Sequence, residues 1–220
     1  MESMKEKIFY LICCLSFFGM PVFAQKDAKA KQALDTAYEK YVAMKGINAY
    51  FTLNITDVKA KLTESFDGNI IMQANKFYLS IPDADTWFDG KTQWVWLKGP
   101  DEVNITEPND KEASMVNPAV LFSIYKSGSN YKYKGEKNDI KNRPVHEIEI
   151  IPAKKTGDIK KIVVQINKTD YMPVTFHVFY KGDLENIVYI NKYTTGTAYP
   201  DNTFVFNKKE HPETEIIDLR

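Results

Sequence analysis

The chain has 220 residues, of which 44% are hydrophobic and 26% are charged. This composition is typical of a folded globular protein, and the length suits one domain with a sizeable core. Lysine plus arginine and aspartate plus glutamate both total 29, so the formal net charge is zero and we expect no nucleic-acid partner.

The first 24 residues have the features of a cleavable export signal. Ile8–Met20 is an apolar run of 13 residues, which is typical of a signal core and too short to span a bilayer. Pro21 ends this run, and Ala24 supplies a small residue at the expected cleavage site. We therefore expect a signal peptide over 1–24 and a single exported domain over 25–220.

Both cysteines, Cys13 and Cys14, lie inside this signal, so the mature domain has no thiol for disulfides, metal binding or catalysis. Lipidation of one of them is disfavoured, because the bulky Ile12 precedes Cys13. Met1 and Met4 both stay open as the start, since starting at Met4 would make the N-terminus net positive.

Two helices are predicted. Lys26–Met44 carries small and apolar residues at i, i+3, i+4 spacing, and Gly46 ends it. Pro118–Tyr125 follows Asn117 as its capping residue and is apolar almost all round. A helix of this kind must be covered on several sides or must itself cover something.

The rest of the chain is dominated by strand patterns in which polar and apolar residues alternate. Asp89-Gly90 predicts a tight turn before the strand Thr92–Leu97. Later strands are expected at Asn130–Lys134, Pro144–Ile151, Lys160–Asn167, Pro173–Tyr180, Asn186–Tyr193 and Thr203–Phe206. About ten or eleven strands with short turns predict one large antiparallel sheet that curls. We expect an α+β fold, a half-open β-barrel whose concave apolar face is covered by the two helices.

No catalytic signature is present. The three histidines are dispersed without metal-ligand spacing, no nucleophile lies in an activating motif, and most carboxylates fall in predicted turns. Trp87, Trp94 and Trp96 are candidates for a stacking platform for bases or sugars, although core or cavity lining explains them equally well. These observations predict a binding or transport protein that is not an enzyme and has no cofactor or metal.

Four short segments form an ordered set along the chain: Ala49–Leu53 with Asp57, Trp87–Trp94, Asn117–Phe122, and Asn202–Phe206 followed by Glu215–Asp218. They resemble the first strand, the Asp-Gly hairpin, the mid-chain helix, and the closing strand and tail of the periplasmic outer-membrane lipoprotein carriers, the LolA-type proteins. The hairpin is the most specific of the four. The resemblance covers nearly all of the expected mature chain.

This resemblance implies an incomplete barrel with an apolar cavity that takes up the acyl chains of lipoproteins. Such carriers receive cargo from an inner-membrane ABC exporter and deliver it to an outer-membrane acceptor, without a cofactor. Each buried CH₂ is worth about 0.8 kcal/mol, so acyl chains need such a shelter to cross the aqueous periplasm. We expect a periplasmic monomer whose cargo is acylated lipoprotein or lipid.

The apolar members of the strand rows are the candidate cavity lining: Phe51, Leu53, Ile55, Ile70, Met72, Phe77, Leu79, Trp94 and Trp96. The expected lid helix contributes Val120, Leu121 and Phe122. Well-known family members hold the lid with an arginine on an early strand, which is absent from Gln73–Phe77. Lys76 is the candidate polar lid contact there, although it lacks the guanidinium fork. A shift of one residue in register would turn each row to the other face.

Other functions stay open. A divergent lipid-binding or lipoprotein-sensing module would use the same trough and would need a surface for a partner. A secreted hydrolase or sugar-binding protein would instead need carboxylates that converge across a cleft. If the helices filled the concavity to full density, the face would be an ordinary structural core.

Overall fold

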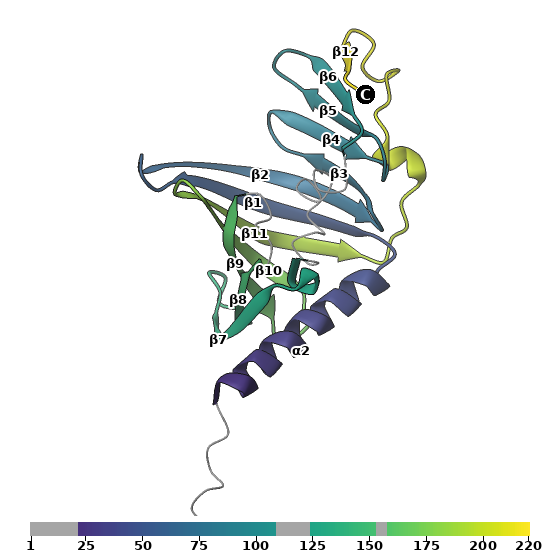
Figure 1. Ribbon diagram of the computed structural model, residues 1–220. Coiled ribbons are helices and arrows are strands. Elements are labelled where there is room, and N and C mark those ends of the chain that lie inside the picture. The colour runs from purple at the N-terminus through teal and green to yellow at the C-terminus, as the bar shows by residue number, and fades with distance from the viewer. Residues whose placement is uncertain (1–21, 109–123, 153–157) are drawn as a thin grey trace, which may run out of the picture.

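The computed structural model describes residues 22–108, 124–152 and 158–220 (Figure 1). A long helix, α2 (Val22–Ala43), precedes the strands. The first six strands are β1 (Ile47–Asp57), β2 (Leu62–Gln73), β3 (Lys76–Ser80), β4 (Ala84–Phe88), β5 (Gln93–Leu97) and β6 (Glu102–Thr106). The short 3₁₀ helix η1 (Ile124–Ser127) comes next. It is followed by β7 (Asn130–Asn138), β8 (Pro144–Ile151), β9 (Ile159–Asn167), β10 (Pro173–Tyr180), β11 (Leu184–Thr195), the 3₁₀ helix η2 (Asp201–Phe204) and β12 (Glu215–Asp218).

All twelve described strands belong to one sheet, in the order β12-β6-β5-β4-β3-β2-β1-β11-β10-β9-β8-β7. Neighbouring strands are antiparallel except for β12, which pairs parallel with β6. The end strands β7 and β12 are not paired with each other in the described residues, so the sheet is curled but unclosed (Figure 1). The predicted large antiparallel sheet is therefore confirmed, with one parallel pair added at its edge.

The helix predicted over Lys26–Met44 is confirmed and begins earlier, at Val22. Its small residues Ala30, Ala33 and Ala37 are buried against strands β7 to β10, which allows the helix to lie close to the sheet. Gly46 follows the helix because no larger residue fits: a Cβ there would be 2.3 Å from the carbonyl oxygen of Thr197. None of the helices in the described residues is long and apolar enough to cross a bilayer.

The sheet has two chemically different faces. The face against α2, here called the helix face, carries apolar rows that continue from strand to strand through the pairs Phe51↔Ile190, Ile70↔Leu79 and Met72↔Phe77. On the outer face, β1 and β2 pair through polar side chains, for example Thr52 with Asp67 at 2.6 Å. Alternation along each strand separates the two faces.

The buried side of the sheet changes beyond β4. There the apolar residues Val103 and Ile105 point to the outer face, where the C-terminal segment covers them with Phe206. Within the described residues, α2 packs on one face over β7 to β10, and the C-terminal segment packs on the other face over β4 to β6.

Two predictions about local structure are not confirmed. The strand predicted over Thr203–Phe206 is wrong: residues 201–204 form η2, in which the amide of Thr203 donates to the carbonyl of Pro200 at 3.0 Å. Phe204 and Phe206 are both buried. Their spacing of two residues resembles that of a strand, but Phe204 belongs to the 3₁₀ helix. Of the helix predicted over Pro118–Tyr125, residues 118–123 lie outside the described residues, and the last two belong to η1.

Candidate functional site

Seven of the candidate cavity residues share the helix face on three adjacent strands. Strand pairing places them in one continuous patch, because residues that face each other across antiparallel strands project to the same side. The seven are Phe51, Leu53 and Ile55 of β1, Ile70 and Met72 of β2, and Phe77 and Leu79 of β3.

Burial is uneven along this patch. Phe77 is 1% exposed and Phe51 is 7% exposed, so the end of the patch nearest the C-terminus of α2 is packed. Leu53 and Ile55 are half-buried, and they lead along β1 toward the β1–β2 hairpin. The helix face therefore passes from a filled core to a partly open apolar surface.

Trp94 and Trp96 do not belong to this patch. Gln93 faces Phe88 across β4 and β5, so Gln93 lies on the helix face and the two tryptophans project to the outer face. There Trp96 packs against His211 of the C-terminal segment, with ring centroids 4.3 Å apart. Placing the tryptophans in one cavity with Phe51 was wrong, because apolarity predicts burial but does not say on which face.

The candidate lid residues give a mixed outcome. Lys76 forms an ion pair of 2.7 Å with Asp201 in the C-terminal segment. Beside it, the Gln73 side-chain amide makes two hydrogen bonds with the backbone of Tyr199, at 2.7 and 3.1 Å. In the described residues this part of the sheet is thus tied to the C-terminal segment. The lid residues Val120, Leu121 and Phe122 lie outside the described residues.

Sequence reasoning missed the other partners of the patch. Tyr41 and Met44 of α2 pack against it, and β11 adds Val188, Ile190 and Tyr193. Burial raises the pKa of Tyr41 to about 12 and raises that of Tyr193 further. The pairing of β1 with β11 joins segments more than a hundred residues apart, and no local pattern signals it.

A buried polar atom of Asn186 lies beside the apolar row, where Glu64 of β2 also faces Ile55. The side-chain oxygen Oδ1 of Asn186 is buried and has no hydrogen-bond partner in the described part of the chain. Asn186 faces Ile55 across β1 and β11, and its Nδ2 donates weakly to the Tyr180 hydroxyl at 3.5 Å. Buried polar atoms are nearly always paired, so this oxygen stands out as a position that a ligand donor could fill.

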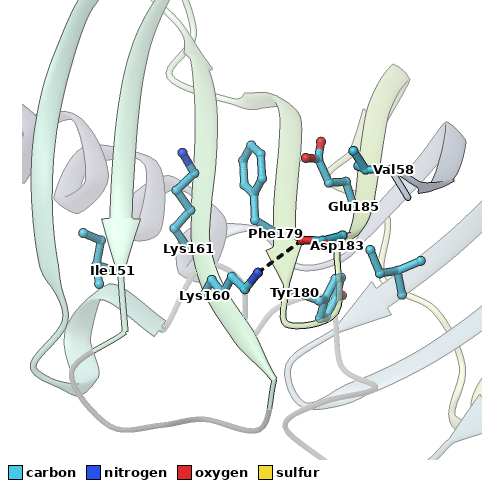
Figure 2. A pocket seen from close by; sticks show the side chains of 9 residues that line it. Val58, Ile151, Lys160, Lys161, Phe179, Tyr180, Asp183 and Glu185 are labelled. Carbon is cyan, nitrogen blue, oxygen red and sulfur yellow. Dashed lines mark ion pairs between the residues drawn. The ribbon is translucent and has the colours of Figure 1, made fainter. Parts of the chain in front are cut away.

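A separate hollow lies at one end of the sheet, where β8 and β10 end and β9 and β11 begin (Figure 2). Its volume is about 270 Å³, and its apolar lining includes Val58, Ile151, Phe179 and Leu184. Its lysines are paired, Lys160 with Asp183 at 3.8 Å and Lys161 with Glu149 at 3.6 Å. None of the candidate cavity residues lines this hollow. Across residues 22–108, 124–152 and 158–220, no three His, Cys, Asp or Glu side chains gather as a metal site.

One solved structure supports the fold, and two others superimpose less closely. An uncharacterised conserved protein from Thermus thermophilus superimposes with a TM-score of 0.56 at 12% identity, covering 86% of this chain and 99% of its own. LprF from Mycobacterium bovis gives a TM-score of 0.47 at 13% identity, covering 81% and 98%. A putative outer membrane lipoprotein-sorting protein domain from Vibrio parahaemolyticus gives 0.40 at 12% identity, covering 83% and 99%.

Comparison with curated proteins gives no match. The family model described as outer membrane lipoprotein carrier protein LolA matches residues 20–182, which is most of the chain, from the start of α2 to the turn after β10. The resemblance drawn from the four sequence segments is confirmed, and the chain belongs to the LolA family of outer membrane lipoprotein carrier proteins.

Proposed function

We propose that this protein is an exported periplasmic carrier that holds the acyl chains of lipoproteins against the helix face and ferries them from the inner to the outer membrane. The observation that carries the proposal is the apolar row on β1, which runs from the buried Phe51 through the half-buried Leu53 and Ile55. The name of the family, a lipoprotein carrier, points to the same function.

The proposal extends to parts of the chain that the structure leaves open. Residues 1–24 act as the cleaved signal, and cleavage after Ala24 shortens α2 by its first three residues. Val120, Leu121 and Phe122 close over the apolar row as a lid. An inner-membrane ABC exporter supplies the cargo and an outer-membrane acceptor takes it, with the carrier acting as a monomer and performing no chemistry.

The energetics suit reversible binding. Each CH₂ that leaves water contributes about 0.8 kcal/mol, so several methylenes on a half-buried row bind usefully. Because Leu53 and Ile55 are already half-buried, the cargo gains less than it would in an empty cavity, which favours release. The proposal assigns the unpaired oxygen of Asn186, beside Ile55, as the acceptor for an amide N–H near the head of an acylated cysteine.

The test is native mass spectrometry of the processed protein isolated from its own periplasm, followed by lipid extraction. Co-purified acylated peptide or lipoprotein supports the carrier function, whereas free phospholipid alone indicates a general lipid carrier. Protein that is empty and also ignores added lipopeptide would refute lipid binding and leave the row as structural core.

A matched pair of variants separates binding from folding. Leu53→Asp places a carboxylate in the apolar row, whereas Asn54→Asp places the same group one residue later on the outer face, where Asn54 accepts from Ser65 at 2.7 Å. Only Leu53→Asp is expected to lose lipopeptide binding at a temperature where both variants remain folded.

A further inference from the structure

The β1–β2 hairpin ends in a loop whose surface chemistry the carrier function does not explain. The loop comprises Val58, Lys59, Ala60 and Lys61, and Leu62 begins β2 directly after it. We propose that this tip docks onto the surface of an anionic phospholipid bilayer. The inference goes beyond the binding of cargo and does not depend on it, because the tip lies outside the proposed cavity.

The tip is held in one conformation. The carboxylate of Asp57 accepts a hydrogen bond from the amide of Ala60 at 2.7 Å, which closes the turn. The amide of Val58 donates to the carbonyl of Asp183 at 2.9 Å, so the neighbouring β10–β11 turn braces the loop. Figure 1 shows the hairpin reaching the edge of the sheet beside that turn. A braced tip presents its side chains without a further ordering cost.

Three aliphatic side chains are exposed at this end. Leu62 is 66% exposed, Val58 is 47% exposed and Leu184 is 38% exposed. Leu62 and Leu184 both face Asp57 across their strand pairs, so they project to the helix face, and Val58 and Leu184 line the hollow of Figure 2. Aliphatic groups gathered at a projecting tip suit insertion at the boundary between headgroups and acyl chains.

The positive charges at the tip indicate which kind of lipid headgroup it would contact. Lys59 and Lys61 are exposed, and within the described residues neither forms an ion pair or a side-chain hydrogen bond. The nearest acids are Asp57, whose carboxylate closes the turn and keeps its charge, and Asp183, which pairs with Lys160. Two free ammonium groups beside exposed aliphatic groups complement anionic headgroups above an apolar layer. Glu64, exposed and further along β2, is one more carboxylate that opposes this contact.

The position of the tip relates the docking site to the proposed cargo site. On the helix face, Leu62 and Leu184 flank Asp57, which follows Leu53 and Ile55 along β1, and Glu64 faces Ile55 on β2. A bilayer bound at the tip would therefore meet the open end of the apolar row.

The experiment is vesicle flotation of the processed protein, comparing vesicles of phosphatidylethanolamine and phosphatidylglycerol with vesicles of phosphatidylcholine. Leu62→Asp is expected to lower the bound fraction about tenfold or more, since it removes an inserted side chain and adds a repelled charge. The double variant Lys59→Ser with Lys61→Ser is expected to lose the preference for the anionic vesicles. High salt is expected to weaken binding of the unmodified protein.

Ile140→Asp is the matched control. Ile140 is 70% exposed and lies in the turn between β7 and β8. This turn is far from the tip, because its Lys141 contacts Asn191 near the C-terminal end of β11. Ile140→Asp is expected to float like the unmodified protein. The proposal is overturned if the unmodified protein binds neither vesicle, binds both equally, or binds no better than Leu62→Asp. Leu53→Asp should float normally even if it loses lipopeptide, so failure of the carrier function and failure of docking are distinguishable.

Discussion

The phenyl ring of Phe51 lies over Gly68, its partner residue on β2. A Cβ built on Gly68 would be 2.4 Å from Cζ of the ring and 2.9 Å from both Cε atoms, far inside normal contact. The glycine therefore leaves the space that the ring fills at the packed end of the helix face. An aromatic side chain that covers a strand glycine in this way also shields the exposed backbone.

Gly68→Val is expected to lower the free energy of unfolding by about 1–3 kcal/mol, because the ring of Phe51 must leave its position. Chemical denaturation measures this change. Gly99→Ala is the control, since a Cβ at Gly99 meets nothing within 4 Å, and its effect should stay within about 0.5 kcal/mol. Equal stability of the two variants would mean that Phe51 can move away without loss of packing.

The edge of the sheet next to α2 contains a titratable contact. Nδ1 of His146 lies 2.8 Å from the Tyr133 hydroxyl, and the ring of Tyr171 packs against the imidazole in a tilted arrangement, with centroids 5.8 Å apart. Burial lowers the pKa of His146 from its ordinary 6.5, because the imidazolium loses water, while the nearby Glu136 carboxylate opposes the shift. The neutral imidazole is thus the form that the folded protein prefers.

We expect this contact to make the fold weaker under mild acid. As the pH falls through 6.5, the unfolded chain binds a proton at His146 before the folded protein does, so the free energy of unfolding decreases. Thermal unfolding between pH 7.5 and 5.5 should show the melting temperature falling by a few degrees, and His146→Gln should flatten that slope. Carboxylates with lowered pKa values, such as Glu136, lose their contribution only nearer their ordinary 4.5. An unchanged slope in His146→Gln would assign the effect elsewhere.

The sequence predicts correctly which side chains share a face when they belong to one helix or one strand. The spacing of Ala30, Ala33 and Ala37 predicts the buried side of α2, and these residues are buried. Alternation along β1 correctly groups Phe51, Leu53 and Ile55 on one face. In each case the geometry of a single helix or strand fixes which side chains lie together.

Relations between distant elements could not be predicted. The length of the turn between Phe88 and Gln93 decides on which face of the sheet Trp94 lies. The apolar character of Trp94 predicts that it is buried, but not on which face. The apolar residues Phe204 and Phe206 have the spacing of a strand, although Phe204 lies in a 3₁₀ helix. The contribution of β11 to the helix face depends on long-range pairing with β1, which local sequence does not record.

The two-faced burial gives a test that separates the tryptophans from the cavity. Trp94 packs in the outer-face cluster with Val103 and Phe206, so Trp94→Ala should lower the free energy of unfolding by about 1–3 kcal/mol and leave lipopeptide binding intact. Denaturation and a lipopeptide-binding assay on the same preparation measure both quantities. If the folded variant lost binding as fully as Leu53→Asp, the outer face would have to take part in holding cargo.

The C-terminal segment is fastened to this outer face through Asp101. Its Oδ1 accepts hydrogen bonds from Trp96 Nε1 at 2.9 Å and from the Thr214 hydroxyl at 2.7 Å, and these two bonds lower the pKa of Asp101. Its carbonyl accepts from the amide of Glu215 at 3.1 Å, just where β12 begins. Asp101 has φ = 57°, a left-handed conformation that aspartate and asparagine tolerate better than most residues. One residue thus joins β5, the turn before β6 and the C-terminal segment.

Removing that side chain should loosen the segment without unfolding the sheet. Asp101→Ala deletes both side-chain bonds and disfavours the left-handed backbone, so trypsin should cut after the exposed Lys208 or Lys209 several-fold faster. Asp101→Asn keeps an acceptor oxygen and the tolerance for positive φ, so its cleavage rate should stay close to that of the unmodified protein. Mass spectrometry of timed digests identifies the site and the rate. Cleavage of Asp101→Ala at the unmodified rate would mean that the rings of Phe206 and His211, with the pairing of β12 to β6, hold the segment without Asp101.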